Sequence, residues 1–101
     1  MEIIYERKFL KDVGKIKDPT VLKRIKNKLE EIEQIVEDHE DDEEAPEIPG
    51  MTKLQGYDYY YRVRVGEFRL GISIEISLDE IEDVVRFVRC LHRKDIYRFF
   101  P

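Results

Sequence analysis

Three arginines share one face of a predicted β-hairpin in the middle of the sequence. Residues 53–76, KLQGYDYYYRVRVGEFRLGISIEI, alternate apolar and polar side chains, the pattern of strands whose successive side chains point to opposite faces. Arg62, Arg64 and Arg69 fall on one face, where only Glu75 opposes them in charge. Because a guanidinium group offers a rigid fork of N–H donors, such a cluster suits phosphate oxygens. The hairpin therefore predicts a phosphate-binding face, with a merely solvated basic face as the alternative.

Aromatic residues are predicted beside these arginines. Tyr60 belongs to the same face of the hairpin, and Tyr97 lies in the C-terminal segment HRKDIYRFFP. Guanidinium groups next to rings that can stack on bases are what single-stranded nucleic acid requires. Nucleic acid or another phosphate ligand is therefore the functional interpretation of this face.

A further strand is predicted at residues 84–91, VVRFVRCL, because this segment is rich in β-branched residues. If Val88 and Cys90 point inward, Arg89 and Arg93 lie on the arginine face as well. Cys90 is the one cysteine in the sequence, and in this position we expect a buried thiol rather than a reactive one.

The two histidines have different surroundings in the sequence. His92 adjoins Arg93 near the rim of the arginine face, which predicts either a role in proton transfer or a structural hydrogen bond. His39 lies in an acidic run, which predicts a solvated side chain. The sequence contains no phosphate-binding loop, nucleophile elbow, paired metal ligands or dinucleotide fingerprint, so no cofactor and no metal are predicted.

Two helices precede the hairpin. Apolar residues recur at helical spacing over residues 7–16, and again from Asp18-Pro19 to about Asp38. The aspartate supplies an N-cap acceptor, and proline suits the first helical position. The apolar stripes consist of Phe9, Leu10, Val13 and Ile16 in the first helix, and of Leu22, Ile25, Leu29, Ile32 and Val36 in the second. Residues 39–50 are acidic and contain two prolines and a glycine, so we expect them to form an exposed loop.

The order strand, helix, helix and then further strands predicts an α+β domain. Amphipathic helices must bury their apolar stripes, so both helices are expected to cover one face of the sheet. The prediction is a single domain over residues 1–101, with two N-terminal helices on one face of a mostly antiparallel, four-stranded twisted sheet. The second face is expected to be open, and residues 92–101 to fold back as a turn or short helix.

Charge is distributed unevenly along the chain. The formal net charge is −5, but residues 30–47 hold eleven acidic residues and no Lys or Arg, whereas residues 1–29 hold nine Lys or Arg and four acidic residues. An anionic partner therefore stays compatible with the low pI. No apolar run reaches the roughly 18–20 residues of a membrane span, and the first residues lack the apolar core of a signal peptide. A cytoplasmic protein without a membrane partner is expected.

Three stretches together resemble the RelE/ParE superfamily of type II toxins: KLQG at residues 53–56, YRVRVGEFRL at residues 61–70 and HRKDIYR at residues 92–98. The resemblance covers essentially the whole chain and includes the order of its elements. For the RelE branch it implies an endoribonuclease, an mRNA interferase that enters the ribosomal A site. Without a metal, the RNA 2′-hydroxyl attacks the adjacent phosphate, and translation is inhibited.

The resemblance also implies roles for individual residues. The catalytic residues that match the family are Arg62, Arg64, Arg69, Arg93 and Tyr97. Arg62 and Arg64 match the paired basic residues, and Arg69 matches the arginine that binds the phosphate. Arg93 matches the residue that acts as general acid or stabilises charge, and Tyr97 the tyrosine that stacks on a base. The second basic residue is the family's usual proton acceptor, but arginine has a pKa far above neutral and accepts a proton poorly. Participation of His92 or mostly electrostatic catalysis are the alternatives. Residues expected to bind RNA are Lys53, Tyr60 and Arg89, and Arg89 is also the alternative match for the C-terminal arginine.

The ParE branch is the alternative within the superfamily, and it implies inhibition of DNA gyrase without nuclease activity. Retention of Arg69 and Tyr97 together with a crowded arginine face favours RNA cleavage. Toxins of this kind are neutralised by an antitoxin protein. The resemblance therefore predicts a cognate antitoxin, in a complex such as a heterotetramer, and mRNA on the ribosome as partners. Residues 96–100 are apolar enough to offer the antitoxin a docking edge.

Overall fold

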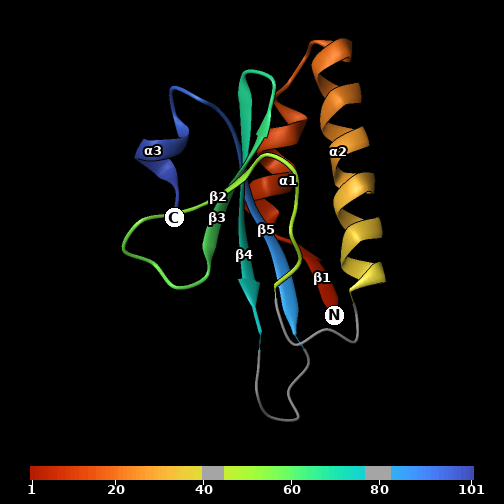
Figure 1. Ribbon diagram of the computed structural model, residues 1–101. Coiled ribbons are helices and arrows are strands. Elements are labelled where there is room, and N and C mark those ends of the chain that lie inside the picture. Colours follow the sequence, from red (N-terminus) through yellow and green to blue (C-terminus); the bar gives the residue numbers. More distant parts are fainter. Residues whose placement is uncertain (40–44, 77–82) are drawn as a thin grey trace.

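A five-stranded sheet forms the centre of the computed structural model, which describes residues 1–39, 45–76 and 83–101 (Figure 1). In chain order the elements are β1 (Glu2–Tyr5), α1 (Arg7–Gly14), α2 (Pro19–Asp38), β2 (Met51–Lys53), β3 (Tyr60–Val65), β4 (Phe68–Glu75), β5 (Val84–His92) and α3 (Ile96–Phe99). The strand order is β1-β5-β4-β3-β2, with β1 parallel to β5 and the other neighbours antiparallel. The predicted α+β class with two N-terminal helices is confirmed.

Within the described residues the sheet has one strand more than predicted. β2 is three residues long and pairs with β3, so that Met51 lies opposite Val63 and Lys53 opposite Tyr61. Three residues are too few to show the two-residue alternation of apolar and polar side chains that indicates a strand. The prediction of four strands is therefore wrong by this one edge strand.

The two N-terminal helices close the core against one sheet face (Figure 1). α2 begins as predicted, because the Asp18 carboxylate accepts hydrogen bonds from the backbone N–H groups of Thr20 and Val21 at 2.8 and 3.4 Å. The buried core residues of the helices and the sheet are Phe9, Ile25, Ile32, Val36, Val63, Leu70, Ile72, Ile74, Val85, Phe87 and Cys90. The apolar side of the predicted hairpin is thus the sheet surface on which the two helices pack.

The buried stripe of α1 differs from the predicted one. Phe9 is buried and its ring lies 5.5 Å from that of Phe87, but Leu10 is 57% exposed. Asp12 takes a buried place instead, three residues after Phe9. An eight-residue helix has too few turns for its apolar spacing to fix which side faces the core.

Part of the predicted exposed loop at residues 39–50 is buried. Pro46 and Ile48 are buried, and the Ile48 side chain belongs to the core cluster, so this prediction is wrong for both residues. The Lys28 ammonium group donates to the backbone carbonyl of Pro49 at 2.7 Å. These contacts hold the chain against α2 before it enters β2. The acidic residues 40–44 lie outside the described part of the chain.

A β-bulge interrupts the pairing of β4 with β5. Gly71 lies opposite Arg89, whereas the next residue, Ile72, lies opposite Phe87. Val88 is therefore an extra residue between the two partners. Cys90 points inward as predicted, but Phe87 is fully buried too, so the simple alternation assumed for this strand is wrong.

The second sheet face is covered in part, contrary to the prediction that it is open. The C-terminal segment folds back as the short helix α3, and Ile96 and Phe100 are buried. A Cβ atom on Gly71 would lie 2.6 Å from Cδ1 of Phe100. Glycine at this position gives the ring a seat on the sheet, and α3 is thereby held over β3 and β4.

Candidate functional site

A cleft of about 340 Å³ on this second face brings four predicted residues together. Its lining comprises Gly50, Met51, Thr52, Arg62, Arg64, Arg69 and Tyr97. β3 and β4 supply the arginines by strand alternation, and α3 supplies the tyrosine. The cleft therefore combines three guanidinium groups with one aromatic ring.

Arg62 and Tyr97 form a stacked pair in this cleft. The guanidinium carbon of Arg62 lies 4.5 Å from the centroid of the Tyr97 ring, within the range of a cation–π contact. Tyr97 is nevertheless 74% exposed. Among the described residues, the buried Nε atom of Arg62 has no hydrogen-bond partner. The pair thus presents a charged group and a largely free ring surface together.

Arg64 and Arg69 lie directly opposite each other in the β3–β4 pair. Like charges at facing positions of a sheet are mutually destabilising. Nη1 of Arg69 donates to the backbone carbonyls of Gly66 and Phe68, both at 2.8 Å, which holds the side chain at the turn between the strands. No carboxylate of the described chain forms an ion pair with Arg62, Arg64 or Arg69. An anion bound here would relieve the repulsion.

Arg93 lies outside the lining of this cleft. Its Nε atom is 2.9 Å from a carboxylate oxygen of Glu67, and its backbone N–H donates to the carbonyl of Glu67 at 2.8 Å. Both side chains are more than half exposed, so water screens the pair and it contributes little to stability. The structure therefore places Arg93 beside the β3–β4 turn, already paired with an acid.

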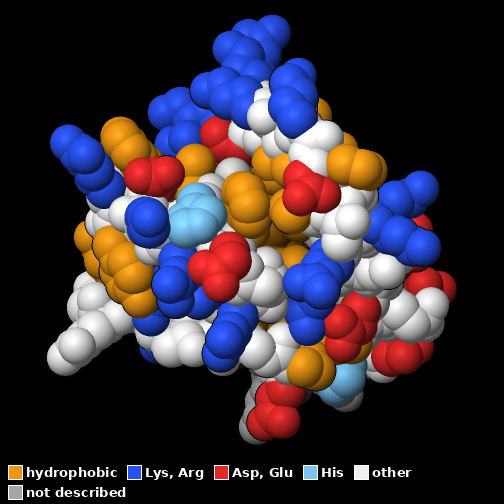
Figure 2. All heavy atoms as spheres, turned by 90° about the horizontal axis from the view of Figure 1, so that it is seen from above, with side chains coloured by type: hydrophobic (Ala, Val, Ile, Leu, Met, Phe, Trp, Pro, Cys, Tyr) orange, Lys and Arg blue, Asp and Glu red, His pale blue; other side chains and the backbone are white. Residues whose placement is uncertain are grey.

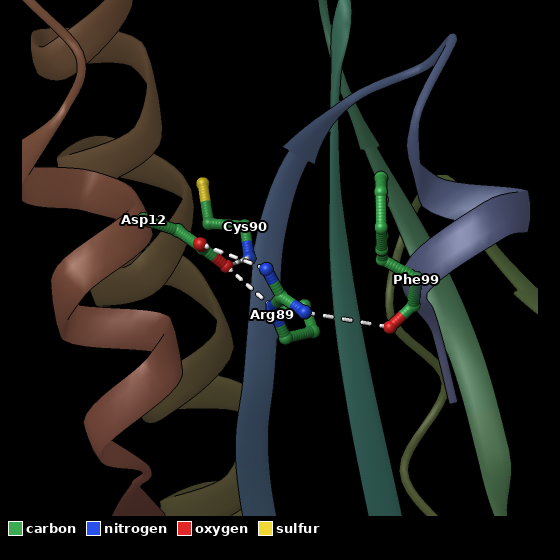
Figure 3. A network of polar contacts seen from close by, with 4 residues as sticks. All are labelled: Asp12, Arg89, Cys90 and Phe99. Carbon is green, nitrogen blue, oxygen red and sulfur yellow. Dashed lines mark hydrogen bonds and ion pairs between the residues drawn. The ribbon is translucent and has the colours of Figure 1, made fainter.

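Arg89 forms an ion pair that sequence reasoning did not reveal (Figure 3). Its Nε and Nη2 atoms donate to the two carboxylate oxygens of Asp12 at 2.8 and 3.0 Å, and these hydrogen bonds raise the pKa of Arg89. Asp12 also accepts the backbone N–H of Cys90 at 3.0 Å. Arg89 Nη1 lies 3.5 Å from the carbonyl oxygen of Phe99. This network joins α1, β5 and α3, and it occupies the guanidinium group.

The sequence holds one indication of this pair, namely the position of Asp12 on the side of α1 that carries Phe9. The residue is three positions after Phe9 on a short amphipathic helix, and a buried carboxylate requires a cationic or N–H partner. Sequence alone offers eighteen Lys and Arg residues as candidates. The spacing of 77 positions between Asp12 and Arg89 gives no local pattern to find.

His92 lies on the helix-facing side of β5, away from the arginine cleft. It is opposite Phe68 in the strand pair, the two rings are 5.6 Å apart, and its Nδ1 atom accepts the backbone N–H of Lys94 at 3.2 Å. It lines a separate cavity of about 800 Å³ together with Asp12 and Phe99. The structure does not bring His92 together with the three cleft arginines.

The end of the molecule that holds the β3–β4 turn and the α1–α2 connection is rich in Lys and Arg. Figure 2 shows blue basic groups around a hollow in which apolar side chains are visible, with scattered acidic groups between them.

Cys90 lines the 800 Å³ cavity, but its side chain is buried. This burial, and to a smaller extent the charge of Asp12, raise the pKa of the Cys90 thiol to about 12. The thiol is therefore unreactive near neutral pH.

Lys53 and Tyr60 lie beside the cleft rather than in its lining. Lys53 is exposed on β2. The Tyr60 ring contacts those of Tyr57, Tyr59 and Phe100, with centroids 5.5, 5.2 and 5.6 Å away. An aromatic cluster thus extends from the arginine cleft toward the loop before β3.

Two further features of the described residues concern metal ligands and membrane-spanning helices. No group of three or more His, Cys, Asp and Glu residues that could hold a metal ion is found among them. None of the helices in the described ranges is long and apolar enough to cross a membrane. The polar side chains that line the arginine cleft are those of Thr52, Tyr97 and the three arginines.

Known proteins resemble this chain over nearly its full length. Toxin RelE3 of Methanocaldococcus jannaschii is 33% identical over 101 residues, 100% of both chains. A chain in the crystal structure of a RelB–RelE antitoxin–toxin complex from Methanococcus jannaschii is 30% identical, with a TM-score of 0.55 over 97% of this chain and 99% of that one. A YoeB/ParE toxin from Agrobacterium tumefaciens shares the fold, at 16% identity, with a TM-score of 0.53 over 92% and 99% of the two chains.

A family comparison gives the same grouping. Residues 3–97 match the ParE toxin family of type II toxin–antitoxin systems, parDE. This range includes the arginine cleft and Tyr97. The chain therefore belongs to the RelE/ParE superfamily of type II toxins.

Proposed function

We propose that this toxin is an mRNA interferase that cleaves ribosome-bound mRNA without a metal and so inhibits translation. The observation that carries the proposal is the cleft in which Arg62, Arg64 and Arg69, none of them paired with a carboxylate of the described chain, lie beside Tyr97. Three fixed positive charges suit a phosphate that becomes more negative during the reaction. An exposed ring beside them suits a neighbouring base.

The proposed reaction needs no component other than the RNA and a proton carrier. The 2′-oxygen forms a bond to the adjacent phosphorus, the bond from phosphorus to the 5′-oxygen breaks, and a 2′,3′-cyclic phosphate remains. The proton lost by the 2′-hydroxyl is balanced by one gained by the leaving 5′-oxygen. Arg62, Arg64 and Arg69 stabilise the pentacoordinate phosphorane, whose negative charge exceeds that of the starting phosphate.

Catalysis in this proposal is mainly electrostatic. The charged side chains lining the cleft are arginines, and a guanidinium group stays protonated near neutral pH and is therefore a poor proton acceptor. His92 faces the helices, so it is not placed to act as a base in this cleft. Water is the proton carrier that this arrangement allows.

The antitoxin partner is part of the same proposal. The related crystal structure is an antitoxin–toxin complex, which supports a cognate antitoxin for this chain. An antitoxin that covers the arginine cleft would block mRNA, and an acidic segment would match the cleft in charge.

The test is cleavage of mRNA on translating ribosomes, followed by mapping of the new 5′ ends. We expect cuts in the A-site codon, and a loss of about 10²–10³-fold in rate for Arg69→Ala, the effect of removing one donor to a developing oxyanion. Arg86→Ala is the matched control, because Arg86 lies on the same sheet face opposite Ser73 but outside the cleft. Equal rates for the wild type and Arg69→Ala would contradict the proposal.

Inhibition of DNA gyrase is the second candidate function, favoured by the match to the ParE toxin family. It is distinguished in the same preparation by the topology of plasmid DNA. Intact mRNA together with relaxed or cleaved plasmid would replace the RNA-cleaving proposal with this one.

A further inference from the structure

The C-terminal helix α3 carries Tyr97 to the arginine cleft, but this helix is too short to hold its own position. It has four residues, and the side chain of its N-cap residue, Asp95, makes no capping hydrogen bond to the described backbone. Helices shorter than about 12 residues are marginal in water unless they pack against the rest of the protein. The place of the Tyr97 ring is therefore set by the contacts that hold α3 to the sheet.

Packing holds one side of α3. Ile96 and Phe100 are buried, and Phe100 is seated against Gly71. These two side chains are four residues apart, so they form a single line of contact along the helix. Tyr97 lies off this line and is largely exposed. Because contact along one line leaves the helix free to tilt about it, a second attachment is needed to fix the ring.

Arg89 supplies the second attachment (Figure 3). Its Nη1 atom donates a long hydrogen bond, 3.5 Å, to the carbonyl oxygen of Phe99, the last residue of α3. Carbonyl groups at the end of a helix have no partner within it, and a cation beside them is favourable. Asp12 binds the Nε and Nη2 atoms of the same guanidinium group. Since the group is a planar, rigid fork, this pairing fixes the direction of Nη1 toward α3.

We propose that Asp12 and Arg89 are positioning residues, which hold α3 so that Tyr97 lies in the arginine cleft. Their effect on RNA cleavage rests on the proposed interferase function, and neither residue lines that cleft. The contacts lead from Asp12 through Arg89 to the Phe99 carbonyl. Tyr97 is two residues before Phe99, and its ring lies on the guanidinium group of Arg62. Arg89 thus acts on the reaction through Tyr97 rather than by touching RNA.

The variant that tests this inference is Arg89→Lys. Lysine keeps a positive charge for Asp12, but its ammonium group lacks the fork that reaches two carboxylate oxygens and the Phe99 carbonyl together. The first measurement is hydrogen exchange of the purified protein, followed by NMR. We expect the backbone amides hydrogen-bonded within α3 to exchange at least about tenfold faster, because α3 opens more often. Unchanged exchange in β4 shows that the variant keeps its fold.

The second measurement is a double-variant cycle in the cleavage of mRNA on translating ribosomes. Arg89→Lys alone should slow cleavage about tenfold, within the loss expected for one stacking ring. In a Tyr97→Ala protein the same change should slow cleavage less than about twofold, because the ring to be positioned is absent. Equal slowing in both backgrounds would overturn the proposal, since it is the result expected if Arg89 contacts RNA itself or only stabilises the fold.

Arg86→Lys is the matched control. Arg86 lies on the same strand as Arg89, but its Nε atom is 4.0 Å from a carboxylate oxygen of Glu75. This change should alter neither the exchange of the α3 amides nor the rate of cleavage.

Asp12→Asn is a second test variant. Asparagine keeps an oxygen that can accept the backbone N–H of Cys90, but it loses the charge and one of the two acceptors that orient Arg89. It should give the same pattern as Arg89→Lys. Unchanged exchange of the α3 amides in both variants would overturn the positioning role.

The exchange measurement separates this inference from the proposed function, because it does not depend on cleavage. Faster exchange of the α3 amides in Arg89→Lys, found together with intact mRNA in the wild-type reaction, would support the attachment of α3 and contradict the interferase function. Cleavage by the wild type together with unchanged exchange in the variants would do the reverse.

Discussion

Arg89 and the arginines of the cleft are the same residue type in two opposite situations. Arg89 donates two hydrogen bonds to the buried carboxylate of Asp12. Arg64 and Arg69 instead face each other across two strands, without a carboxylate partner in the described chain. The first arrangement stabilises the fold, and the second weakens it unless an anion is present. An arginine's role is therefore indicated by whether the protein itself neutralises it.

The largest expected effect is on stability, from Asp12→Ala. Removing one partner of a largely buried ion pair leaves the other charge unpaired, which costs about 3–5 kcal/mol. Asp12 is 5% exposed and Arg89 18% exposed at their side chains. Urea denaturation of the purified protein measures the loss in the free energy of unfolding.

A double variant, Asp12→Ala with Arg89→Met, sharpens this prediction. Replacing both partners by apolar groups removes the unpaired charge, so much of the stability should return. If the double variant is as unstable as Asp12→Ala, the unpaired charge of Arg89 is not the cause of the lost stability.

A smaller effect is expected from Tyr97→Ala, and it concerns activity rather than stability. Loss of a base-stacking ring costs about 1–3 kcal/mol, so cleavage should slow roughly 5- to 150-fold. Tyr97→Phe keeps the ring and should retain most of the rate. Phe99→Ala is the control, since Phe99 is an exposed ring on the same short helix that lies outside the arginine cleft. Equal rates for Tyr97→Ala and Tyr97→Phe would exclude stacking.

The smallest expected effect is a gain in stability from Arg64→Thr. Removing one of two facing like charges should raise the free energy of unfolding by about 0.2–1 kcal/mol, while cleavage falls. The control is Arg86→Thr, because Arg86 lies 4.0 Å from a carboxylate oxygen of Glu75 and has an opposite charge beside it. A loss of stability in Arg64→Thr would show that the protein itself compensates the Arg64 charge.

The arginine cleft could be predicted because its information is local in the sequence. Arg62, Arg64 and Arg69 belong to one hairpin, where the two-residue period fixes their common face. Tyr97 was predicted beside them because the aromatic C-terminal segment was expected to fold back, and the cleft confirms that these residues lie together. Their catalytic roles stay predictions.

Other features depended on contacts between distant segments. The Asp12–Arg89 pair spans 77 positions, and the burial of Ile48 depends on a core formed by other elements. His92 was expected near the arginines, but its place follows from its pairing with Phe68. Local periodicity cannot specify any of these, because each is decided by which elements meet in three dimensions.

The bulge at Val88 changes which residues of β5 face the core. Before it, odd-numbered residues such as Val85 and Phe87 point into the core; after it, the even-numbered Cys90 does. The effect of a substitution in this strand therefore depends on which side of Val88 it lies. One unpaired residue lets a single strand contribute to the core on both sides of the bulge and still place Arg89 between Asp12 of α1 and the carbonyl of Phe99 in α3.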